Sequence, residues 1–346
     1  MKKLLVSAIE PSANLHLKNL IDRLKADGLS PQIGGIFDPK LGKVDFNSNE
    51  FNVMGFLDVI PKIFKAKKTI KKLAILSLNY DKVLLIDAPS FNIPLAKAIK
   101  KINPKITIIY YILPKVWVWK KNRIKTVEQF TDIQASIFPF EKQFFKNSIY
   151  VGNPLIEEIK QTKKELTNNG IIAFLAGSRK SEIKSLMNIF REVAKEIDKK
   201  KILVIPPHFS SQEIAEIYGD ISLFEISTNT HNTLLKSDFA FICSGTATLE
   251  ASIIGTPFVL VYIAKKFDAL IVKTFIKLNF VGLANIILDY QNKQPLHKEL
   301  LQEQVTKTNL LTQYKNLDRT KFIKSSNELK NHLKTGIDKE LYNIII

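Results

Sequence analysis

Short apolar runs alternate along the chain with segments in which apolar residues recur at helical spacing. Five runs in the first half are predicted as strands: Leu4–Ala8, Gln32–Phe37, Lys82–Ile86, Ile106–Ile112 and Ile133–Phe138. Four more follow in the second half: Ile171–Leu175, Ile202–Ile205, Phe239–Ile242 and Phe258–Val261. Most are nearly continuous in apolar residues, as expected of parallel strands that are covered on both faces. The segments between them that we predict as helices include Leu15–Lys25, Pro94–Lys101, Ser181–Asp198 and Ala247–Ile254.

This alternation of strands and helices is typical of α/β proteins with doubly wound parallel sheets. It occurs in two sets, and the pattern breaks at Gly152-Asn153-Pro154. We therefore predict two Rossmann-like domains, residues 1–154 and 155–325, that face each other across a cleft. We expect a C-terminal helix at 326–346 to pack back on the first domain. Ligands of such sheets bind beyond the carboxyl ends of the strands, so motifs directly after strands are the candidate sites.

Charge adds a second constraint, because 51 lysines and arginines face 33 acidic residues and leave a net charge of +18. Residues 1–155 hold 25 of the bases and 12 of the acids, a net of +13. Such a surplus predicts an anionic partner: nucleic acid, a membrane surface or a phosphorylated substrate. Only five of the bases are arginine. An arginine inside a motif therefore has added weight, because its planar fork binds phosphate bidentately.

Several classes of protein are disfavoured. The single cysteine, Cys243, cannot form an internal disulfide or a cysteine-based metal site, which fits a reducing cytoplasm. The five histidines are scattered and predict no metal site. The apolar start Leu4–Ile9 is too short for a signal peptide, and no apolar run approaches the roughly 20 residues of a transmembrane helix. We therefore expect any membrane attachment to be peripheral.

Two motifs follow strands in the first half. Glu10, Ser12 and Asn14 lie at a strand–turn–helix junction, whose free amides suit an anion or a sugar. The alternative is a helix start that is capped by Ser12 or Asn14. Asp87 ends the Lys82–Ile86 strand, where a carboxylate can act as general base toward a hydroxyl. Its alternative is a structural role, in which it caps the next helix or binds a neighbouring amide.

Two small, hydroxyl-rich turns follow strands in the second half. Their backbone amides, hydroxyls and one arginine suit a pyrophosphate. The residues expected to contact it are Gly177, Ser178, Arg179, Ser244, Gly245, Thr246 and Thr248. Glu250 lies about one turn into the second helix, where its carboxylate could bind both hydroxyls of a ribose. The alternatives are a surface turn and a capped helix, but two such turns favour nucleotide binding. Neither has the spacing of a Walker A loop or of GxGxxG.

The segment Pro61–Leu73 is basic and amphipathic. Ile63, Phe64, Ile70 and Leu73 can share a stripe flanked by lysines, which is typical of a helix on anionic lipid. The alternative is a surface helix with its apolar side in the core. Residues 265–277 form a second segment of this kind. Two tryptophans after a strand suit either the core or an apolar lip for acyl chains. The predicted membrane or acyl contacts are Phe64, Lys67, Lys68, Lys71, Lys72, Trp117 and Trp119.

Together these motifs resemble those of the lipid-A-disaccharide synthases, a family of GT-B glycosyltransferases. The resemblance runs from about residue 3 to about residue 302. Its segments, in order, are SAIEPSANLH, MGFLDVIP, IDAPSFN, LPKVWVW, FPFE, GNP, AGSRKSEI, SGTATLEA and GLANII. Some positions depart from the family pattern. Ile9 and Ala13 replace glycines, Asn14 replaces Asp, Asn153 replaces His, and Ala176 and Ala284 replace prolines.

The resemblance implies a reaction between two membrane-embedded lipids, UDP-2,3-diacylglucosamine and 2,3-diacylglucosamine 1-phosphate. It yields UDP and a β(1→6)-linked disaccharide phosphate by inversion, without a metal or cofactor. It implies that Asp87 takes the proton of the acceptor 6-hydroxyl and that Arg179 and the turn amides hold the diphosphate. Glu250 would hold the ribose, and Asn285 and Glu10 would orient the sugars. We expect a cytoplasmic protein that docks peripherally on the anionic inner membrane. The sequence leaves open whether the protein forms a homodimer.

Two alternatives remain at this point. One is another GT-B enzyme, such as a MurG-like transferase or a UDP-GlcNAc 2-epimerase, although the IDAP and VWVW segments argue against it. The other is a basic nucleic-acid-binding protein. The sequence has no helix-turn-helix, zinc-finger or RNP signature and few arginines, so we expect no nucleic-acid partner.

Overall fold

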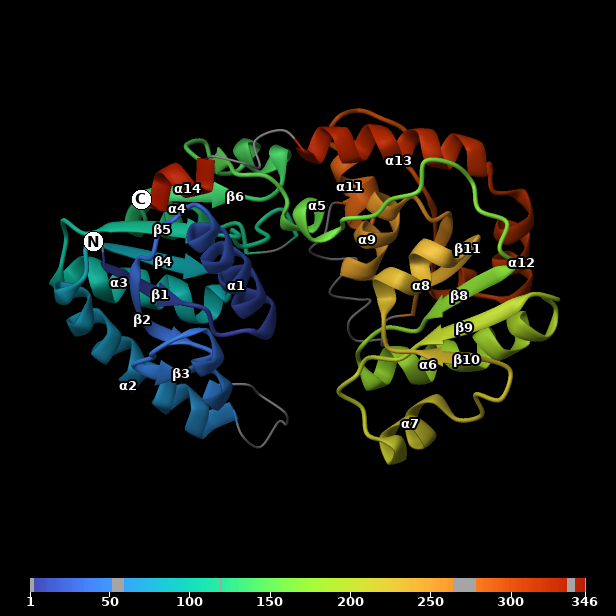
Figure 1. The fold of residues 1–346 in the computed structure, drawn as a ribbon, viewed down its shortest axis with the longest axis horizontal. Helices are drawn as coiled ribbons and strands as arrows, with labels where there is room; N and C mark the ends of the chain where they lie inside the picture. The colour runs from blue at the N-terminus through green and yellow to red at the C-terminus, as the bar shows by residue number, and fades with distance from the viewer. Residues whose placement is uncertain (1–2, 52–58, 119, 264–277, 335–339, 346) are drawn as a thin grey trace. The chain divides into compact units, whose positions relative to one another are not determined.

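The chain folds into two compact units. The computed structural model describes residues 3–51, 59–118, 120–263, 278–334 and 340–345. One unit comprises Met1–Pro154 together with Thr335–Ile346, and the other comprises Leu155–Lys334. Each unit is built on its own parallel sheet (Figure 1), so the predicted α/β class with two Rossmann-like units is confirmed.

The first sheet has the strand order β3-β2-β1-β4-β5-β6-β7, and every pair in it is parallel. Its strands are β1 (Lys3–Ser7), β2 (Gln32–Phe37), β3 (Phe46–Asn47), β4 (Lys82–Ile86), β5 (Thr107–Tyr111), β6 (Ile133–Ser136) and β7 (Ile149–Tyr150). The helices of this unit include α1 (Pro11–Ala26), α2 (Val59–Leu76), α3 (Pro89–Ile102), α4 (Arg123–Phe130) and α14 (Glu340–Ile345). Proline stands at the first position of α1 and of α3, where its missing N–H costs no hydrogen bond.

Helices cover both faces of this sheet, and the strand residues alternate between two cores. Val83 and Leu85 of β4 belong to the core that also contains residues of α2 and α3. Leu84 and Ile86 belong to the core that contains residues of α1. This double burial explains why β4 reads as a continuous apolar run rather than an alternating one.

The chain end packs against the first unit. Ile345 of α14 is buried in the core beside α1, and Lys82 donates from Nζ to the carbonyl of Ile344 at 2.8 Å. The expected C-terminal piece began at residue 326, but this position lies inside α13 (Arg319–Lys334) of the second unit. There the Ser326 hydroxyl donates to the Ser252 carbonyl at 2.5 Å.

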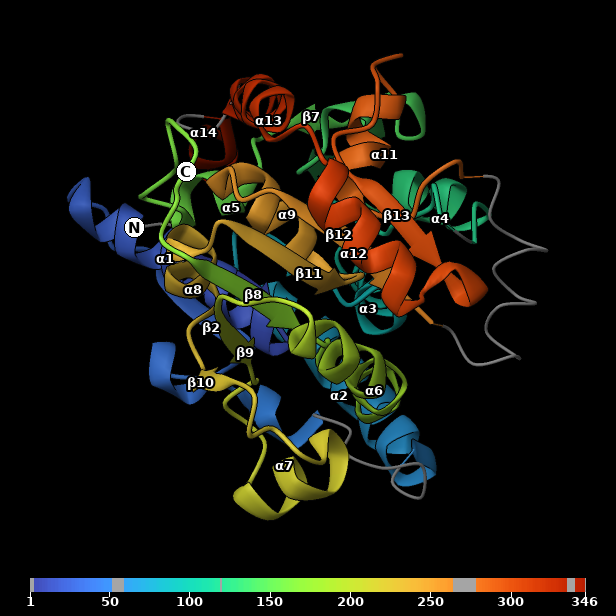
Figure 2. The same cartoon turned by 90° about the vertical axis from the view of Figure 1, so that its right-hand side faces the viewer.

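The second sheet has the strand order β10-β9-β8-β11-β12-β13, again all parallel, and its strands follow one another in this order in Figure 2. They are β8 (Ile171–Leu175), β9 (Lys200–Val204), β10 (Glu225–Ser227), β11 (Phe239–Cys243), β12 (Phe258–Tyr262) and β13 (Lys298–Leu301). The helices of this part include α5 (Pro154–Glu158), α6 (Lys180–Lys195), α7 (Ser211–Tyr218), α8 (Thr230–Lys236), α9 (Thr246–Ile254), α11 (Leu283–Asp289) and α12 (Lys307–Asn316), besides α13.

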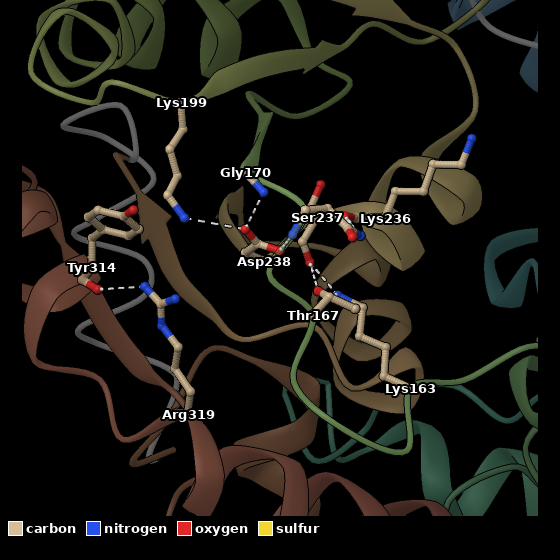
Figure 3. A network of polar contacts seen from close by, with 10 residues as sticks. Lys163, Thr167, Gly170, Lys199, Lys236, Ser237, Asp238, Tyr314 and Arg319 are labelled. Atoms are coloured by element: carbon tan, nitrogen blue, oxygen red, sulfur yellow. Dashed lines mark hydrogen bonds and ion pairs between the residues drawn. The ribbon is translucent and has the colours of Figure 1, made fainter.

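A polar network holds the amino-terminal ends of these strands (Figure 3). The Asp238 carboxylate, just before β11, accepts hydrogen bonds from the backbone of Asn169 at 2.7 Å and of Gly170 at 2.8 Å, before β8. Lys199, before β9, reaches the same carboxylate at 3.3 Å. Nearby, the Lys163 ammonium donates to the carbonyl of Ser237. One buried carboxylate therefore joins the starts of three neighbouring strands. These starts lie at the opposite end of the strands from the carboxyl ends, where the candidate site is expected.

This network makes a prediction about stability. Burial alone would raise the pKa of Asp238. The hydrogen bonds from the amides of Asn169 and Gly170 and from the Lys199 ammonium lower it by more than burial raises it, so its pKa lies below the ordinary value. In an Asp238→Asn variant, the side-chain NH₂ group replaces one carboxylate oxygen. It then faces the backbone N–H of Asn169 or Gly170, so two donors meet without an acceptor. We expect it to lose about 2 to 4 kcal/mol of unfolding free energy at pH 7, measured by urea denaturation.

A lowered pKa means that this contribution is present above the ordinary aspartate pKa and is lost as pH falls through the folded value. The difference between wild type and Asp238→Asn should therefore shrink below about pH 4. As a control, Glu225→Gln removes a surface pair with Lys200 and should cost less than about 1 kcal/mol. A loss at Asp238 no larger than this control, or one that persists unchanged at pH 2, would contradict the account.

Candidate functional site

The first cluster of candidate residues lies where the strand order of the first sheet reverses. The chain proceeds from β1 to β2 and β3 on one side, and then returns to β4 on the other side of β1. Glu10 follows β1 and Asp87 follows β4, so both emerge at the carboxyl ends of two adjacent strands. This is the position at which open α/β sheets bind ligands.

Asp87 stands on an unusual backbone. Asp87 has φ +49° and the next residue, Ala88, has φ +44°, so two successive non-glycine residues are left-handed. The Asp87 carboxyl does not cap α3, since Ala88 occupies the N-cap position. It accepts a hydrogen bond from the Ala88 amide. Binding to a neighbouring amide was one of the two structural roles considered for Asp87 from the sequence. Strained backbone of this kind clusters at functional sites.

Burial and nearby charges set the proton affinity of these two carboxyls. Burial raises the pKa of Asp87, and the Lys115 ammonium and Ala88 amide oppose the rise. Glu10 is an exposed residue, but its carboxyl is partly desolvated, which raises its pKa. The Asp87 charge raises it further, and Lys115 opposes both. Both carboxyls therefore have a pKa above the ordinary value, in each case chiefly because of burial.

The capping alternative for Ser12 and Asn14 is not found, and the two residues differ in burial. The helix begins at Pro11 rather than later, so neither Ser12 nor Asn14 is its cap. Ser12 is exposed in the first turn. Asn14 is buried, its amide donates to the carbonyl of Glu10 at 3.1 Å and to the Ser48 hydroxyl at 3.2 Å, and its oxygen accepts from the Asp38 amide at 2.7 Å. Asn14 thus braces the Glu10 loop from inside the fold.

The second cluster lies at the corresponding reversal in the second sheet, between β8 and β11. Gly177 follows β8 with φ +99°, and a Cβ there would come within 2.8 Å of the Glu182 carboxylate and 3.1 Å of the Cys243 sulfur. Glycine is therefore required by both backbone conformation and space. The turn after β8 and the turn after β11 meet at this point, as the adjacent strands demand.

Arg179 projects from the first of these turns. Its guanidinium donates to the Glu182 carboxylate at 2.6 Å, while the Arg179 side chain is 74% exposed and that of Glu182 only 8%. The pair raises the pKa of Arg179. Glu182 thus tethers an exposed guanidinium in one direction while leaving donors free for an anion.

The other candidate residues of the two turns divide into an exposed group and a more buried group. Gly245 and Thr246 are exposed at the start of α9, and Ser178 is exposed at the start of α6. Thr248 is buried, and its hydroxyl donates to the Gly245 carbonyl at 2.7 Å. Ser244 is half-buried and its amide donates to the Val261 carbonyl at 3.1 Å. Thr248 therefore shapes the turn that presents its neighbours.

Glu250 lies one turn further along α9, with another carboxylate, that of Glu158, near it. Burial raises its pKa to about 7, with a further contribution from the charge of Glu158 at the end of α5. His231 of α8 lies on the other side, with its Nδ1 3.9 Å from Oε1 of Glu250. Glu250 is thus a carboxyl whose ionisation is sensitive to pH near neutrality.

Asn285 differs from the sugar-orienting role that we expected. It is fully buried, and its amide donates to the carbonyl of His297 at 2.9 Å and to the Glu299 carboxylate at 2.8 Å. Its oxygen accepts from the backbone amides of Leu296 at 2.8 Å and His297 at 3.3 Å. Both donors and both acceptor positions are occupied, so Asn285 joins α11 to β13.

Trp117 is 5% exposed and packs edge-on against two phenylalanines of the FPFE segment. The ring centroids lie 6.1 Å from Phe138 and 5.4 Å from Phe140. Beneath them burial raises the pKa of Glu141 to about 8, opposed first by the amide of Phe138. Trp117 thus belongs to the core and does not form an apolar edge that acyl chains could contact. Trp119 lies outside the described residues.

The apolar stripe predicted on α2 divides between two faces. Leu73 is fully buried and Ile70 packs beside it, whereas Phe64 is 68% exposed and Ile63 is 48% exposed. Phe64 and Leu73 are nine residues apart, which is two and a half helical turns, so they point in opposite directions. The four candidate lysines are all exposed: Lys67, Lys68, Lys71 and Lys72. The basic segment 265–277 and most of the MGFLDVIP segment lie outside the described residues.

Among the described residues, no helix combines the length and apolarity that crossing a membrane requires. No three of the described histidine, cysteine or acidic side chains gather as metal ligands would.

Some residues at the site were not singled out from the sequence. Glu182 lies three positions after Arg179, a spacing that brings side chains together on a helix and could have identified the pair. Lys115 lies in a motif that we noted only for its tryptophans. Its effect on Glu10 and Asp87 comes from the adjacency of β1, β4 and β5, which no local pattern reveals.

Solved structures share this fold. MurG from Acinetobacter baumannii aligns with a TM-score of 0.59 and 13% identity over 100% of this chain and 99% of that chain. S. aureus MnaA, determined with UDP, aligns with a TM-score of 0.61 and 16% identity over 97% and 94%. A putative UDP-N-acetylglucosamine 2-epimerase from Listeria monocytogenes gives 0.59 and 14% over 97% and 93%. At such identities the likeness shows the fold alone, and it confirms the GT-B architecture.

Sequence relatives are far more similar. The lipid-A-disaccharide synthase of Campylobacter jejuni (strain RM1221) is 48% identical over 100% of this chain and 99% of its own. That of Helicobacter pylori (strain ATCC 700392 / 26695) is 43% identical over 99% and 98%. The model of the lipid-A-disaccharide synthetase family matches residues 4–344. The resemblance seen in the motifs is confirmed: the chain belongs to the lipid-A-disaccharide synthase family.

Proposed function

We propose that this chain transfers 2,3-diacylglucosamine from UDP-2,3-diacylglucosamine to the 6-hydroxyl of 2,3-diacylglucosamine 1-phosphate. Family membership supports the reaction. The observation that carries the mechanism is Asp87, a half-buried carboxylate of raised pKa on a left-handed turn where the first sheet reverses. The products are UDP and the β(1→6)-linked disaccharide 1-phosphate.

In the proposed chemistry, Asp87 accepts the proton of the acceptor 6-hydroxyl as its oxygen attacks the anomeric carbon. The bond from that carbon to the diphosphate breaks on the opposite face, and its electron pair leaves with UDP. The configuration therefore inverts in one displacement. A raised pKa favours Asp87 for this task, because a base works best when its proton affinity is matched to neutral pH.

We assign the binding of the leaving diphosphate to the second unit. Arg179 and the turn residues Gly177, Ser178, Gly245 and Thr246 lie beyond the adjacent strands β8 and β11. The guanidinium and the backbone amides of these turns would stabilise the negative charge that develops on UDP. Glu250 accepts hydrogen bonds from the two ribose hydroxyls. Glu10, beside Asp87, orients the acceptor sugar.

The first prediction tests the base. Asp87→Asn keeps the shape of the side chain but removes its proton affinity, so turnover should fall about 10²- to 10⁴-fold. UDP affinity should stay within about twofold, because Asp87 takes no part in holding the nucleotide. Asp22→Asn, an exposed carboxylate on α1 paired with Lys18, serves as the control with normal turnover. Near-normal turnover of Asp87→Asn would overturn the assignment.

The second prediction concerns the pH dependence of UDP binding. The ribose hydroxyls bind the ionised carboxylate, and burial and Glu158 hold the pKa of Glu250 at about 7. UDP affinity measured by calorimetry should therefore rise as pH increases through about 7. Glu158→Gln removes a negative charge, lowers the pKa of Glu250 and should move this midpoint to lower pH.

UDP has a titrating phosphate of its own, so Glu250→Gln provides the baseline for the ligand. The component that disappears in Glu250→Gln is the part that belongs to the carboxylate. If the pH profile of UDP affinity is the same in wild type and Glu250→Gln, Glu250 does not bind the ribose.

Both substrates carry acyl chains, and α2 offers a surface that suits an anionic bilayer. The helix contains no acidic residue. Its exposed side combines the lysines Lys67, Lys68, Lys71 and Lys72 with apolar groups, of which Phe64 is 68% exposed and Ile75 58%. Lysines at an anionic surface and apolar side chains at the acyl boundary together favour peripheral docking. These features support the proposal that the first unit docks on the inner membrane.

The third prediction tests this surface. Replacing Lys67, Lys68, Lys71 and Lys72 with glutamine should weaken cosedimentation with vesicles containing anionic lipid at least about tenfold, since each lysine near such a surface contributes about 1 kcal/mol. The control variant replaces four exposed lysines of the second unit, namely Lys184, Lys195, Lys200 and Lys315, with glutamine. It changes net charge equally and should keep binding. Equal loss in both variants would show only a general charge effect.

A further inference from the structure

The left-handed turn at Asp87 and Ala88 has an energetic cost that something must offset. Left-handed backbone is unfavourable for a residue with a side chain, because its Cβ comes too close to the following carbonyl oxygen, and here two such residues are adjacent. The peptide groups around them are nevertheless fully engaged. The Asp87 amide donates to the carbonyl of Tyr111 at 3.0 Å, which ties the turn to β5.

The Asp87 carbonyl is held by two side chains. The Asn92 amide group donates to it at 2.8 Å, and the Tyr110 hydroxyl donates to it at 2.9 Å. Asn92 comes from the first turns of α3 and Tyr110 from β5, and both are fully buried. A carbonyl oxygen has two lone pairs, so these donors saturate it.

Asn92 is itself fixed in one orientation. Its nitrogen also donates to the carbonyl of Ile86 at 3.1 Å, and its oxygen accepts from the hydroxyl of Ser7 at 2.6 Å. A flipped amide would set its oxygen against two carbonyl oxygens, so only this orientation is satisfied. Ser7 is 1% exposed at the end of β1. The network therefore joins β1, β4, β5 and α3.

Tyr110 remains a donor throughout the range in which the enzyme would work. Burial raises the pKa of its hydroxyl well above the ordinary value, and the charge of Asp87 adds to the rise. The proton that reaches the Asp87 carbonyl therefore stays in place at neutral pH. Asn92 and Tyr110 bond to the backbone carbonyl of Asp87 rather than to its carboxyl, and Ser7 bonds to Asn92. The three side chains therefore hold the backbone of Asp87.

We infer that Ser7, Asn92 and Tyr110 are positioning residues that aim the Asp87 carboxyl at the acceptor hydroxyl by locking the Asp87 peptide in its left-handed turn. This inference rests on the proposed role of Asp87 as the base. A base that is misaimed by a fraction of an ångström loses rate without losing substrate affinity. The network thus acts on turnover through Asp87 alone.

A double-mutant cycle tests this inference, with wild type, Tyr110→Phe, Asp87→Asn and the double variant. Tyr110→Phe removes one hydroxyl and should lower kcat about tenfold, with KM for both substrates within about twofold. In the Asp87→Asn background the same change should alter the residual kcat less than about twofold, because no base remains to be aimed. Tyr80→Phe, whose hydroxyl contacts Asp45 at 3.4 Å elsewhere in the unit, is the matched control with unchanged kcat.

Equal fold-losses in both backgrounds, or an unchanged kcat in Tyr110→Phe, would overturn the inference. If Tyr110→Phe fails to fold, Ser7→Ala decides in its place, since it removes only the hydroxyl that orients Asn92. Ser7→Ala should lower kcat at least about threefold in the wild-type background and leave the Asp87→Asn rate unchanged. Failure of the proposed function is a separate result, namely near-normal kcat in Asp87→Asn alone.

Discussion

Parallel strand pairing is the constraint on which the two candidate clusters depend. When neighbouring strands run in the same direction, every loop that leaves their carboxyl ends emerges at one edge of the sheet. Glu10 and Asp87 are 77 positions apart but follow the adjacent strands β1 and β4. Gly177 and Ser244 follow the adjacent strands β8 and β11. The apolar residues that bury both faces of each sheet therefore also assemble the polar groups.

The polar residues of the motifs serve two purposes, and burial separates them. Asp87, Arg179 and Glu250 keep part of their surface available for a ligand. Asn14 and Asn285, which occur in equally prominent motifs, are buried, and their amides are occupied by neighbouring backbone and side-chain groups. Each joins a loop to a neighbouring element. Loops can carry chemistry only when their own buried polar groups are satisfied in this way.

Much of the fold could be predicted because its strong signals are local. The bounds of β2, β4 and β8 agree with the predicted apolar runs. The short strands β3 and β7 hold two residues each, too few to produce a pattern. The edge strand β13 reads as Lys-Glu-Leu-Leu, in which the charged residues hide its pairing with β12.

The site was predictable only in part, for a different reason. A motif gives residue types and their order, which was enough to select Asp87 and Arg179. It does not give the direction of a side chain relative to the core. Phe64 and Leu73 were therefore assigned to one stripe, although half a turn separates their directions. The contacts of Tyr110 and Asn92 with Asp87 join different elements, so they became visible only in the folded chain.

The central claim is that this chain joins two acylated glucosamines with release of UDP. The most direct measurement incubates the purified protein with UDP-2,3-diacylglucosamine and 2,3-diacylglucosamine 1-phosphate and follows both products by mass spectrometry and NMR. The account predicts one UDP for each β(1→6)-linked disaccharide 1-phosphate. Release of UDP without a disaccharide, or conversion of the UDP-sugar to an epimer, would contradict it.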